Sequence, residues 1–177
     1  MKTAGARRHV KLFPYVPKDH ESVENRLIYA LKSKDYATLH DFFAEKLAEA
    51  VLPNIGHNGY AVTYMPRSRA SVTRFGFDQS KRIAKALARK LDLPFFFVIR
   101  HRGRKTQKQL NRAERKENAE ASYYLRRGAN ISYKRVLLVD DVSTSGATLA
   151  SGIRLLKSCG VKTVIPVTLG ATIYREK

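Results

Sequence analysis

The segment from Val136 to Leu149 constrains the fold more than any other part of this 177-residue chain. It opens with four apolar residues and continues with the adjacent carboxylates of Asp140 and Asp141. Small and hydroxylated residues follow before a new apolar pattern begins. A short, wholly apolar run is typical of a strand covered on both faces. A buried strand that ends in a polar loop and leads into a helix predicts an α/β protein.

The rest of the chain repeats this alternation of strand-like runs and amphipathic helices. Strands are predicted at residues 10–13, 60–65, 95–99, 122–125, 136–139 and 164–169. Helices are predicted at residues 24–32, 36–52, 77–91 and 147–158, and Gly160 is placed to close the last one in a left-handed conformation. This order predicts a central parallel sheet with right-handed crossovers and helices on both faces. Ligands of such sheets bind at the carboxyl ends of the strands.

The residues that follow strand 136–139 predict a site for a phosphorylated sugar. The loop consists of Ser143, Thr144, Ser145, Gly146, Ala147 and Thr148. Its hydroxyl groups and the free amides of a helix start suit a phosphate, and Gly146 lets the backbone approach closely. Asp140 and Asp141 would repel that phosphate unless they face ribose hydroxyls and a hydrated Mg²⁺.

Helix capping by Asp140 and Asp141, with Ser and Thr as turn residues, is the simpler alternative. Capping needs one such residue, whereas this segment supplies six. Other nucleotide-binding loops fit less well, because the sequence contains neither G-x-x-x-x-G-K-[ST] nor G-x-G-x-x-G.

This segment resembles the signature of type I phosphoribosyltransferases. The resemblance implies their fold: a central parallel sheet flanked by helices, a flexible loop and a small hood. It also implies roles for the residues. Asp140 and Asp141 would hold the ribose hydroxyls on the catalytic, Mg²⁺-facing side, with the metal held directly or through water. Residues 143–148 would wrap the 5′-phosphate of phosphoribosyl pyrophosphate (PRPP) or a similar ribose 5-phosphate.

Two further stretches, residues 74–79 (Arg-Phe-Gly-Phe-Asp-Gln) and 106–118, are similar to hallmarks of the ComF family. Its members are phosphoribosyltransferase-like proteins associated with DNA uptake in naturally competent bacteria. The similarity covers about residues 25–170 and implies single-stranded DNA and a DNA-translocating helicase as candidate partners. Typical members begin with a cysteine-rich zinc module. Cys159 is the only cysteine of this chain, so no zinc is expected.

The resemblance also implies which residues form the other sides of the site. Pyrophosphate would lie on the loop after strand 60–65, at Arg67, Ser68, Arg69 and Arg74, since arginine binds two oxygens at once. The alternative is that these are ordinary exposed arginines on a turn. The mobile loop would contribute Lys105, Gln107, Arg112, Arg115 and Asn118; alternatively, its second half is a solvated helix. Tyr123 and Tyr124 beside these cations suggest a base-stacking surface, although buried strand residues are the commoner interpretation.

Composition adds a preference for anionic partners. The formal net charge is +19, from 34 Lys and Arg against 15 Asp and Glu, and residues 100–116 concentrate eight of the cations. No apolar run is long enough to span a bilayer and no secretory signal is visible, so a cytoplasmic location is expected. We expect residues 1–55 to form an N-terminal arm and hood, and residues 56–177 to form the core with a flexible loop at about 100–120.

Two functions remain open from the sequence. Purine-specific enzymes resemble one another in placing an acid just before the final Thr-Gly pair of the phosphate loop, and here that position is Thr144. The usual activation of a purine is therefore not expected. In the first hypothesis, the protein binds PRPP and acts in the handling of single-stranded DNA during DNA uptake. In the other it is an active phosphoribosyltransferase whose acceptor is unidentified.

Overall fold

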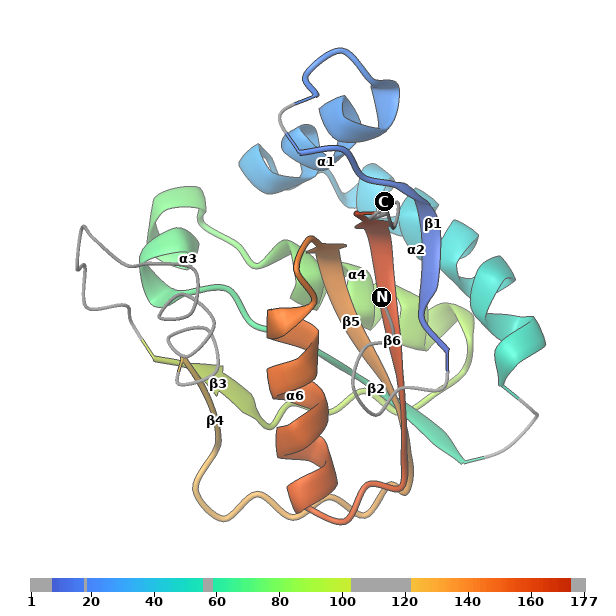
Figure 1. Ribbon diagram of the computed structural model, residues 1–177, viewed down its shortest axis with the longest axis vertical. Helices are drawn as coiled ribbons and strands as arrows, with labels where there is room; N and C mark the ends of the chain where they lie inside the picture. The colour runs from blue at the N-terminus through green and yellow to red at the C-terminus, as the bar shows by residue number, and fades with distance from the viewer. Residues whose placement is uncertain (1–7, 18, 56–58, 103–121, 173–177) are drawn as a thin grey trace, which may run out of the picture.

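A four-stranded parallel sheet forms the centre of the protein (Figure 1). The computed structural model describes residues 8–17, 19–55, 59–102 and 122–172. The order of the strands is β1-β6-β5-β2, and their bounds are Val10–Pro14 for β1, Tyr60–Tyr64 for β2, Arg135–Ser143 for β5 and Thr163–Ala171 for β6. All three pairings are parallel, which confirms the predicted fold class.

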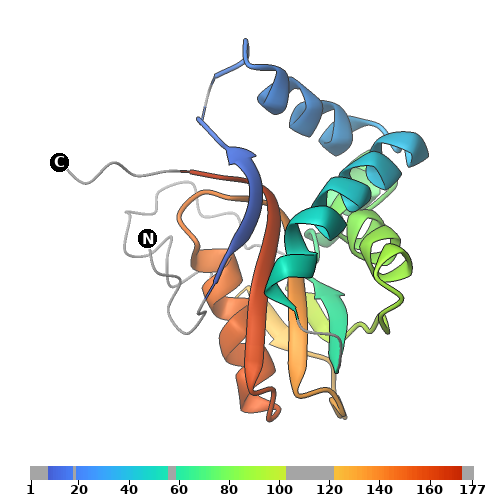
Figure 2. The same cartoon turned by 90° about the vertical axis from the view of Figure 1, so that its right-hand side faces the viewer.

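Helices cover both faces of this sheet (Figure 2). Helices α2 (Ala37–Val51) and α4 (Gln79–Lys90) pack on one face, and α6 (Ala147–Ser158) packs on the other. Successive side chains of a strand point to opposite faces. Accordingly, Leu137 of β5 joins the core under α2 and α4, while Leu138 joins the core under α6, and both are fully buried.

The N-terminal elements divide between the core and the carboxyl edge of the sheet. Strand β1 pairs with β6 from Val10↔Val167 onward, and α2 packs against α4 and continues into a short 3-10 turn, η1 (Leu52–Asn54). Helix α1 (Val23–Ser33) lies over the carboxyl ends of the strands (Figure 1). Of the residues assigned above to an arm and hood, β1 and α2 thus share the main core, and α1 overhangs the sheet edge.

The aromatic run at residues 95–99 departs from the prediction of a strand in the parallel sheet. Only Phe95 forms a parallel bridge, with Val62. The chain then leaves the sheet and forms β3 (Ile99–His101), which pairs antiparallel with β4 (Tyr123–Leu125). An apolar run indicates that a segment is buried, but it does not indicate which strand that segment will pair with.

Two local elements also differ from the prediction. Strand β5 continues through the acidic pair to Ser143, and Asp140 pairs with Thr168 of β6, so the carboxylates belong to the strand and not to the loop. A helix, α3 (Arg69–Phe75), follows the predicted turn; Ser68 caps its start and Gly76, at φ 80°, ends it. Seven residues are too few to show a helical period. None of the helices in the described part of the chain is long and apolar enough to cross a membrane.

Candidate functional site

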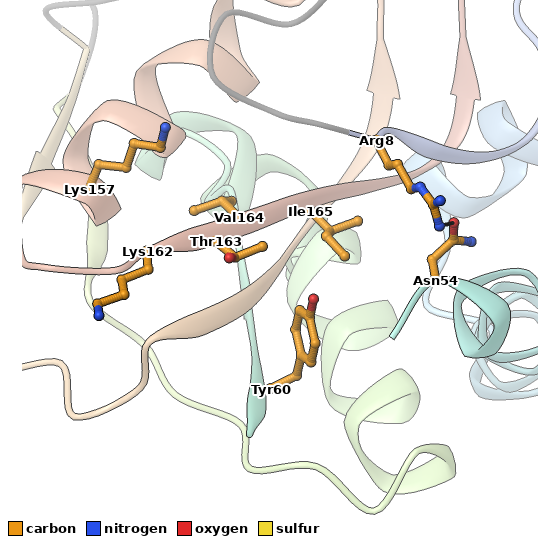
Figure 3. Close-up of a pocket in the computed structure, with 8 residues that line it drawn as sticks. All are labelled: Arg8, Asn54, Tyr60, Lys157, Lys162, Thr163, Val164 and Ile165. Atoms are coloured by element: carbon orange, nitrogen blue, oxygen red, sulfur yellow. Dashed lines mark hydrogen bonds between the residues drawn. The ribbon is translucent and has the colours of Figure 1, made fainter. Parts of the chain in front are cut away.

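The predicted site residues and one large cavity lie at opposite ends of the sheet. One cavity of about 590 Å³ opens at the amino ends of β2 and β6 (Figure 3). Its lining includes Tyr60, Lys157 and Lys162, and none of the residues predicted to bind ligand lies there. The acidic pair is found at the other end, at the carboxyl edge, where α/β proteins bind ligands.

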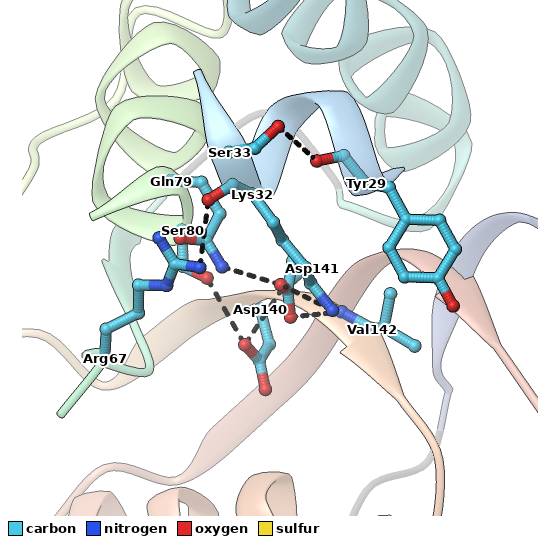
Figure 4. A network of polar contacts seen from close by, with 9 residues as sticks. All are labelled: Tyr29, Lys32, Ser33, Arg67, Gln79, Ser80, Asp140, Asp141 and Val142. Carbon is cyan, nitrogen blue, oxygen red and sulfur yellow. Dashed lines mark hydrogen bonds and ion pairs between the residues drawn. The ribbon is translucent and has the colours of Figure 1, made fainter. Parts of the chain in front are cut away.

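Asp140 and Asp141 lie near the carboxyl end of β5 in a network of polar contacts (Figure 4). Asp140 is only 8% exposed, and its Oδ1 accepts hydrogen bonds from the amide of Asp141 at 2.9 Å and from Ser80 Oγ at 3.3 Å. Asp141 Oδ2 accepts from Gln79 Nε2 at 2.7 Å and lies 3.3 Å from Lys32 Nζ. The two carboxylates are therefore oriented by side chains of α4 and α1.

Electrostatics make this pair receptive to a cation. Burial, followed by the neighbouring charge of Asp141, raises the pKa of Asp140 well above its ordinary value, and Lys32 opposes this rise. A carboxyl group whose charged form is disfavoured by burial and by a like charge gains when positive charge arrives. A carboxyl group perturbed in this way at a cleft is typical of functional sites.

A cavity of about 300 Å³ lies against the pair, a volume suited to a small ligand. Its lining is Lys32, Met65, Pro66, Arg67, Gln79, Ser80, Tyr123, Asp140, Asp141, Val142 and Thr148. Two buried polar atoms here, Arg67 Nη1 and Gln79 Oε1, have no hydrogen-bond partner within the described part of the chain. Buried polar atoms are costly to leave unpaired, so these two are candidate ligand contacts.

The predicted phosphate loop connects β5 to α6 beside this cavity. Gly146 adopts φ 75° at the start of α6, a conformation that favours glycine. Thr148 lines the cavity, whereas Thr144 and Ser145 are exposed and Ser143 is buried at the end of the strand. The first amides of the 12-residue helix α6 provide donors and a favourable dipole for an anion.

The predicted pyrophosphate residues are brought together only in part. The guanidinium of Arg67 lies over the ring of Phe75 at 4.7 Å and donates to the carbonyl of Lys32 at 3.2 Å, which aims it at the cavity. Ser68 caps α3, and Arg74 is exposed with its guanidinium 5.1 Å from the ring of Phe75. Arg69 lines a neighbouring cavity.

That neighbouring cavity, of about 360 Å³, shares Pro66 and Arg67 with the first one and is both aromatic and cationic. Tyr64 stacks between Phe95 and Phe97, with ring centroids 6.0 and 5.9 Å apart. Several cations lie over these and adjacent rings: Lys85 over Phe95, Lys81 and Arg100 over Phe97, and Arg102 over Tyr124. We call these eight residues the aromatic–cation surface.

Sequence reasoning missed Lys32, Gln79, Ser80 and the cavity-lining role of Tyr123. Gln79 stood inside the quoted stretch 74–79, which was the one available signal for it. Lys32 gave no signal, because it ends an ordinary amphipathic helix. The predicted mobile-loop residues lie outside the described residues: Lys105, Gln107, Arg112, Arg115 and Asn118.

Comparisons with known proteins agree with this geometry. Residues 78–175, more than half of the chain, match the phosphoribosyl transferase domain family. The chain is 32% identical to Competence protein F of Haemophilus influenzae over 142 residues, which are 78% of this chain and 56% of that protein. It is 24% identical to Competence protein ComFC of Streptococcus pneumoniae over 155 residues, 83% of this chain and 68% of that protein.

Solved structures of two phosphoribosyltransferases are also similar. Adenine phosphoribosyltransferase from Thermoanaerobacter pseudethanolicus superposes with a TM-score of 0.48 at 18% identity, covering 76% of this chain and 81% of that one. A hypoxanthine phosphoribosyltransferase from Staphylococcus aureus gives 0.44 at 17% identity, covering 84% and 64%. The family match and the parallel sheet confirm the type I phosphoribosyltransferase fold. The chain belongs to the phosphoribosyl transferase domain family and is a phosphoribosyltransferase-like protein of the ComF type.

Proposed function

We propose that this protein binds PRPP, or a closely related ribose 5-phosphate, in the cavity beside Asp140 and Asp141. The observation that carries the proposal is an acidic pair, with Asp140 buried, that shares its cavity with Thr148 in the first turn of α6. Asp140 and Asp141 would accept hydrogen bonds from the ribose hydroxyls. Residues 143–148 would bind the 5′-phosphate, and Arg67, whose Nη1 has no partner within the described chain, would bind the pyrophosphate.

Mg²⁺ fits this arrangement as a companion of the ligand. Carboxylate oxygens are ligands that Mg²⁺ prefers, and it commonly keeps waters and phosphate oxygens as the others. The described residues contain no cluster of three or more His, Cys, Asp or Glu. When bound, Mg²⁺ would neutralise charge on the pyrophosphate. Asp140 and Asp141 are the residues that would hold it, directly or through water.

Titration calorimetry with PRPP and Mg²⁺ tests the proposal. We expect binding to the intact protein and a higher melting temperature, since a ligand that binds only the folded state stabilises it. Asp141→Asn should weaken binding, because it removes a charge and changes the hydrogen bond to Gln79. Asp41→Asn is the matched control, as Asp41 is exposed and pairs with Arg89 on the surface. Absence of binding to the intact protein with Mg²⁺ present would reject the site.

A role in single-stranded DNA handling is supported by the aromatic–cation surface and by relatives named as competence proteins. Aromatic rings that stack bases, together with cations that bind phosphates, are what non-specific single-strand binding requires. A DNA-translocating helicase is the partner class that such a role implies. The net charge of +19 favours binding to a polyanion.

Binding of oligodeoxythymidylate measured by fluorescence anisotropy tests this role. The logarithm of affinity should fall with the logarithm of salt, with a slope of about −0.7 for each phosphate neutralised. Phe97→Ala should weaken binding, and Lys81→Ala should also flatten the slope. Arg89→Ala removes one charge on the same helix outside this surface and serves as the control. No binding to the intact protein at low salt would contradict the role.

The alternative function is transfer of the ribose to an acceptor. The proposed PRPP-binding residues favour it, while Thr144 at the position of the purine-activating acid argues against an ordinary purine acceptor. Release of pyrophosphate from PRPP, screened against panels of nucleobases and amines, distinguishes the two. Release that depends on one acceptor and disappears in Asp141→Asn would favour the transferase.

A further inference from the structure

Lys32 reaches the acidic pair from a separate element of the fold (Figure 4). It lies in the last turn of α1, which overhangs the carboxyl edge, and its Nζ is 3.3 Å from Asp141 Oδ2. The side chain is 32% exposed, whereas that of Asp141 is 13% exposed. This contact therefore differs from the ion pair between Arg89 of α4 and Asp41 of α2, whose side chains are 72% and 52% exposed.

The position of Lys32 is held at both ends. Its ammonium group contacts Asp141, and its backbone carbonyl accepts a hydrogen bond from Arg67 Nη2 at 3.2 Å. Arg67 is itself fixed over the rings of Phe75 and Phe77 at 4.7 and 5.9 Å. The ammonium group is thus presented to the cavity by a packed framework, unlike that of an ordinary surface lysine.

The oxygens of Asp141 already have partners in this arrangement. Oδ1 accepts from the amide of Val142 at 2.6 Å, and Oδ2 accepts from Gln79 at 2.7 Å in addition to the contact with Lys32. A metal ion, or a water bound to one, that approaches Oδ2 would meet the ammonium group at close range. Two cations at one carboxylate oxygen repel each other, and a partly buried site screens that repulsion less than bulk water does.

We propose that Lys32 is a resident counter-ion of the acidic pair that competes with Mg²⁺ for Asp141. The Lys32–Asp141 contact would open when PRPP enters with its metal. The position of the Lys32 side chain on α1 would therefore depend on whether the site holds PRPP and its metal. The place of PRPP in this scheme rests on the function proposed above. Competition between Lys32 and a divalent cation at Asp141 can be tested without PRPP, because it depends on the Lys32–Asp141 contact.

The test compares Lys32→Met, which keeps the length of the stem and removes the charge, with Lys34→Met. Lys34 lies two residues further on and its ammonium group is 6.0 Å from the ring of Tyr36, away from the cavity. Calorimetry gives the Mg²⁺ concentration at which PRPP binding is half-maximal. We expect Lys32→Met to lower that concentration by roughly tenfold, within the range typical of coupled sites, and Lys34→Met to leave it unchanged.

Two results would overturn the proposal. An unchanged Mg²⁺ requirement in Lys32→Met would remove the competition, and weaker PRPP binding at saturating Mg²⁺ would make Lys32 a ligand of PRPP instead. Lys32→Gln repeats the test if Lys32→Met does not fold. If PRPP binds none of these proteins, the proposed function fails, and Mn²⁺ titration followed by electron paramagnetic resonance tests Lys32 without PRPP. Tighter Mn²⁺ binding in Lys32→Met than in Lys34→Met supports the competition, and equal binding rejects it.

Discussion

Gly152 is the position in α6 at which a single added methyl group should lower the stability of the protein most. The helix packs on β5 so closely there that a Cβ would overlap Met65 Sδ and lie 2.9 Å from Leu138 Cδ2. Both neighbours are buried, with exposures of 2% and 0%. Neither can turn into solvent to relieve the overlap, and Met65 is followed directly by Pro66 in the wall of the ligand cavity.

Two opposing effects decide the outcome of Gly152→Ala. Alanine in a helix interior is more favourable than glycine by up to about 1 kcal/mol. Overpacking a filled core typically costs about 1–3 kcal/mol, and two simultaneous overlaps with buried neighbours place this site toward the upper end. The net loss should be about 1–2 kcal/mol in the free energy of unfolding. For a chain of this size, that corresponds to a fall in melting temperature of about 3–6 °C.

Urea denaturation of the intact protein and of Gly152→Ala measures this loss. A double-mutant cycle with Met65→Ala supplies the control, because removal of the Met65 thioether should make Gly152→Ala less costly and give a coupling energy of about 1 kcal/mol. If Gly152→Ala is as stable as the intact protein, or if the cycle shows no coupling, the close approach of α6 to β5 at this point would be refuted.

Three further predictions concern other parts of the chain. Burial lowers the pKa of His40, so near this pKa the folded state binds fewer protons than the unfolded state. The free energy of unfolding, measured in urea, should therefore fall as the pH drops below about 6.5, the ordinary pKa of histidine. The fall should be smaller in His40→Phe. Arg89→Ala breaks the exposed pair with Asp41 and should change the unfolding free energy by less than about 0.5 kcal/mol. Gln79→Met should weaken calorimetric PRPP affinity with Mg²⁺ by roughly tenfold, the effect of one hydrogen bond to a charged group. Unchanged affinity in that variant would exclude Gln79 as a positioning residue for Asp141.

The strand and the helix that flank the site could be predicted directly from the sequence. Helix α6 begins at Ala147 and ends at Ser158, as its apolar period predicts, and Gly160 adopts φ 82° just beyond it. Strand β5 and the acidic pair lie at the predicted carboxyl edge of a parallel sheet. These features depend on contacts between residues close in the chain and on the alternation of strands and helices, and both are visible in residue order.

The partners of the acidic pair were decided by tertiary structure. Ser80 and Gln79 lie 60 and 62 residues from the carboxylates that they contact, and Lys32 comes from a helix still earlier in the chain. Likewise, the aromatic run after Pro94 makes one bridge with Val62 and then departs to a second sheet. Hydrophobic periodicity predicts which face of an element is buried. It contains no information on which distant polar side chain will meet a given carboxylate, because that depends on how the packed helices are placed around the sheet.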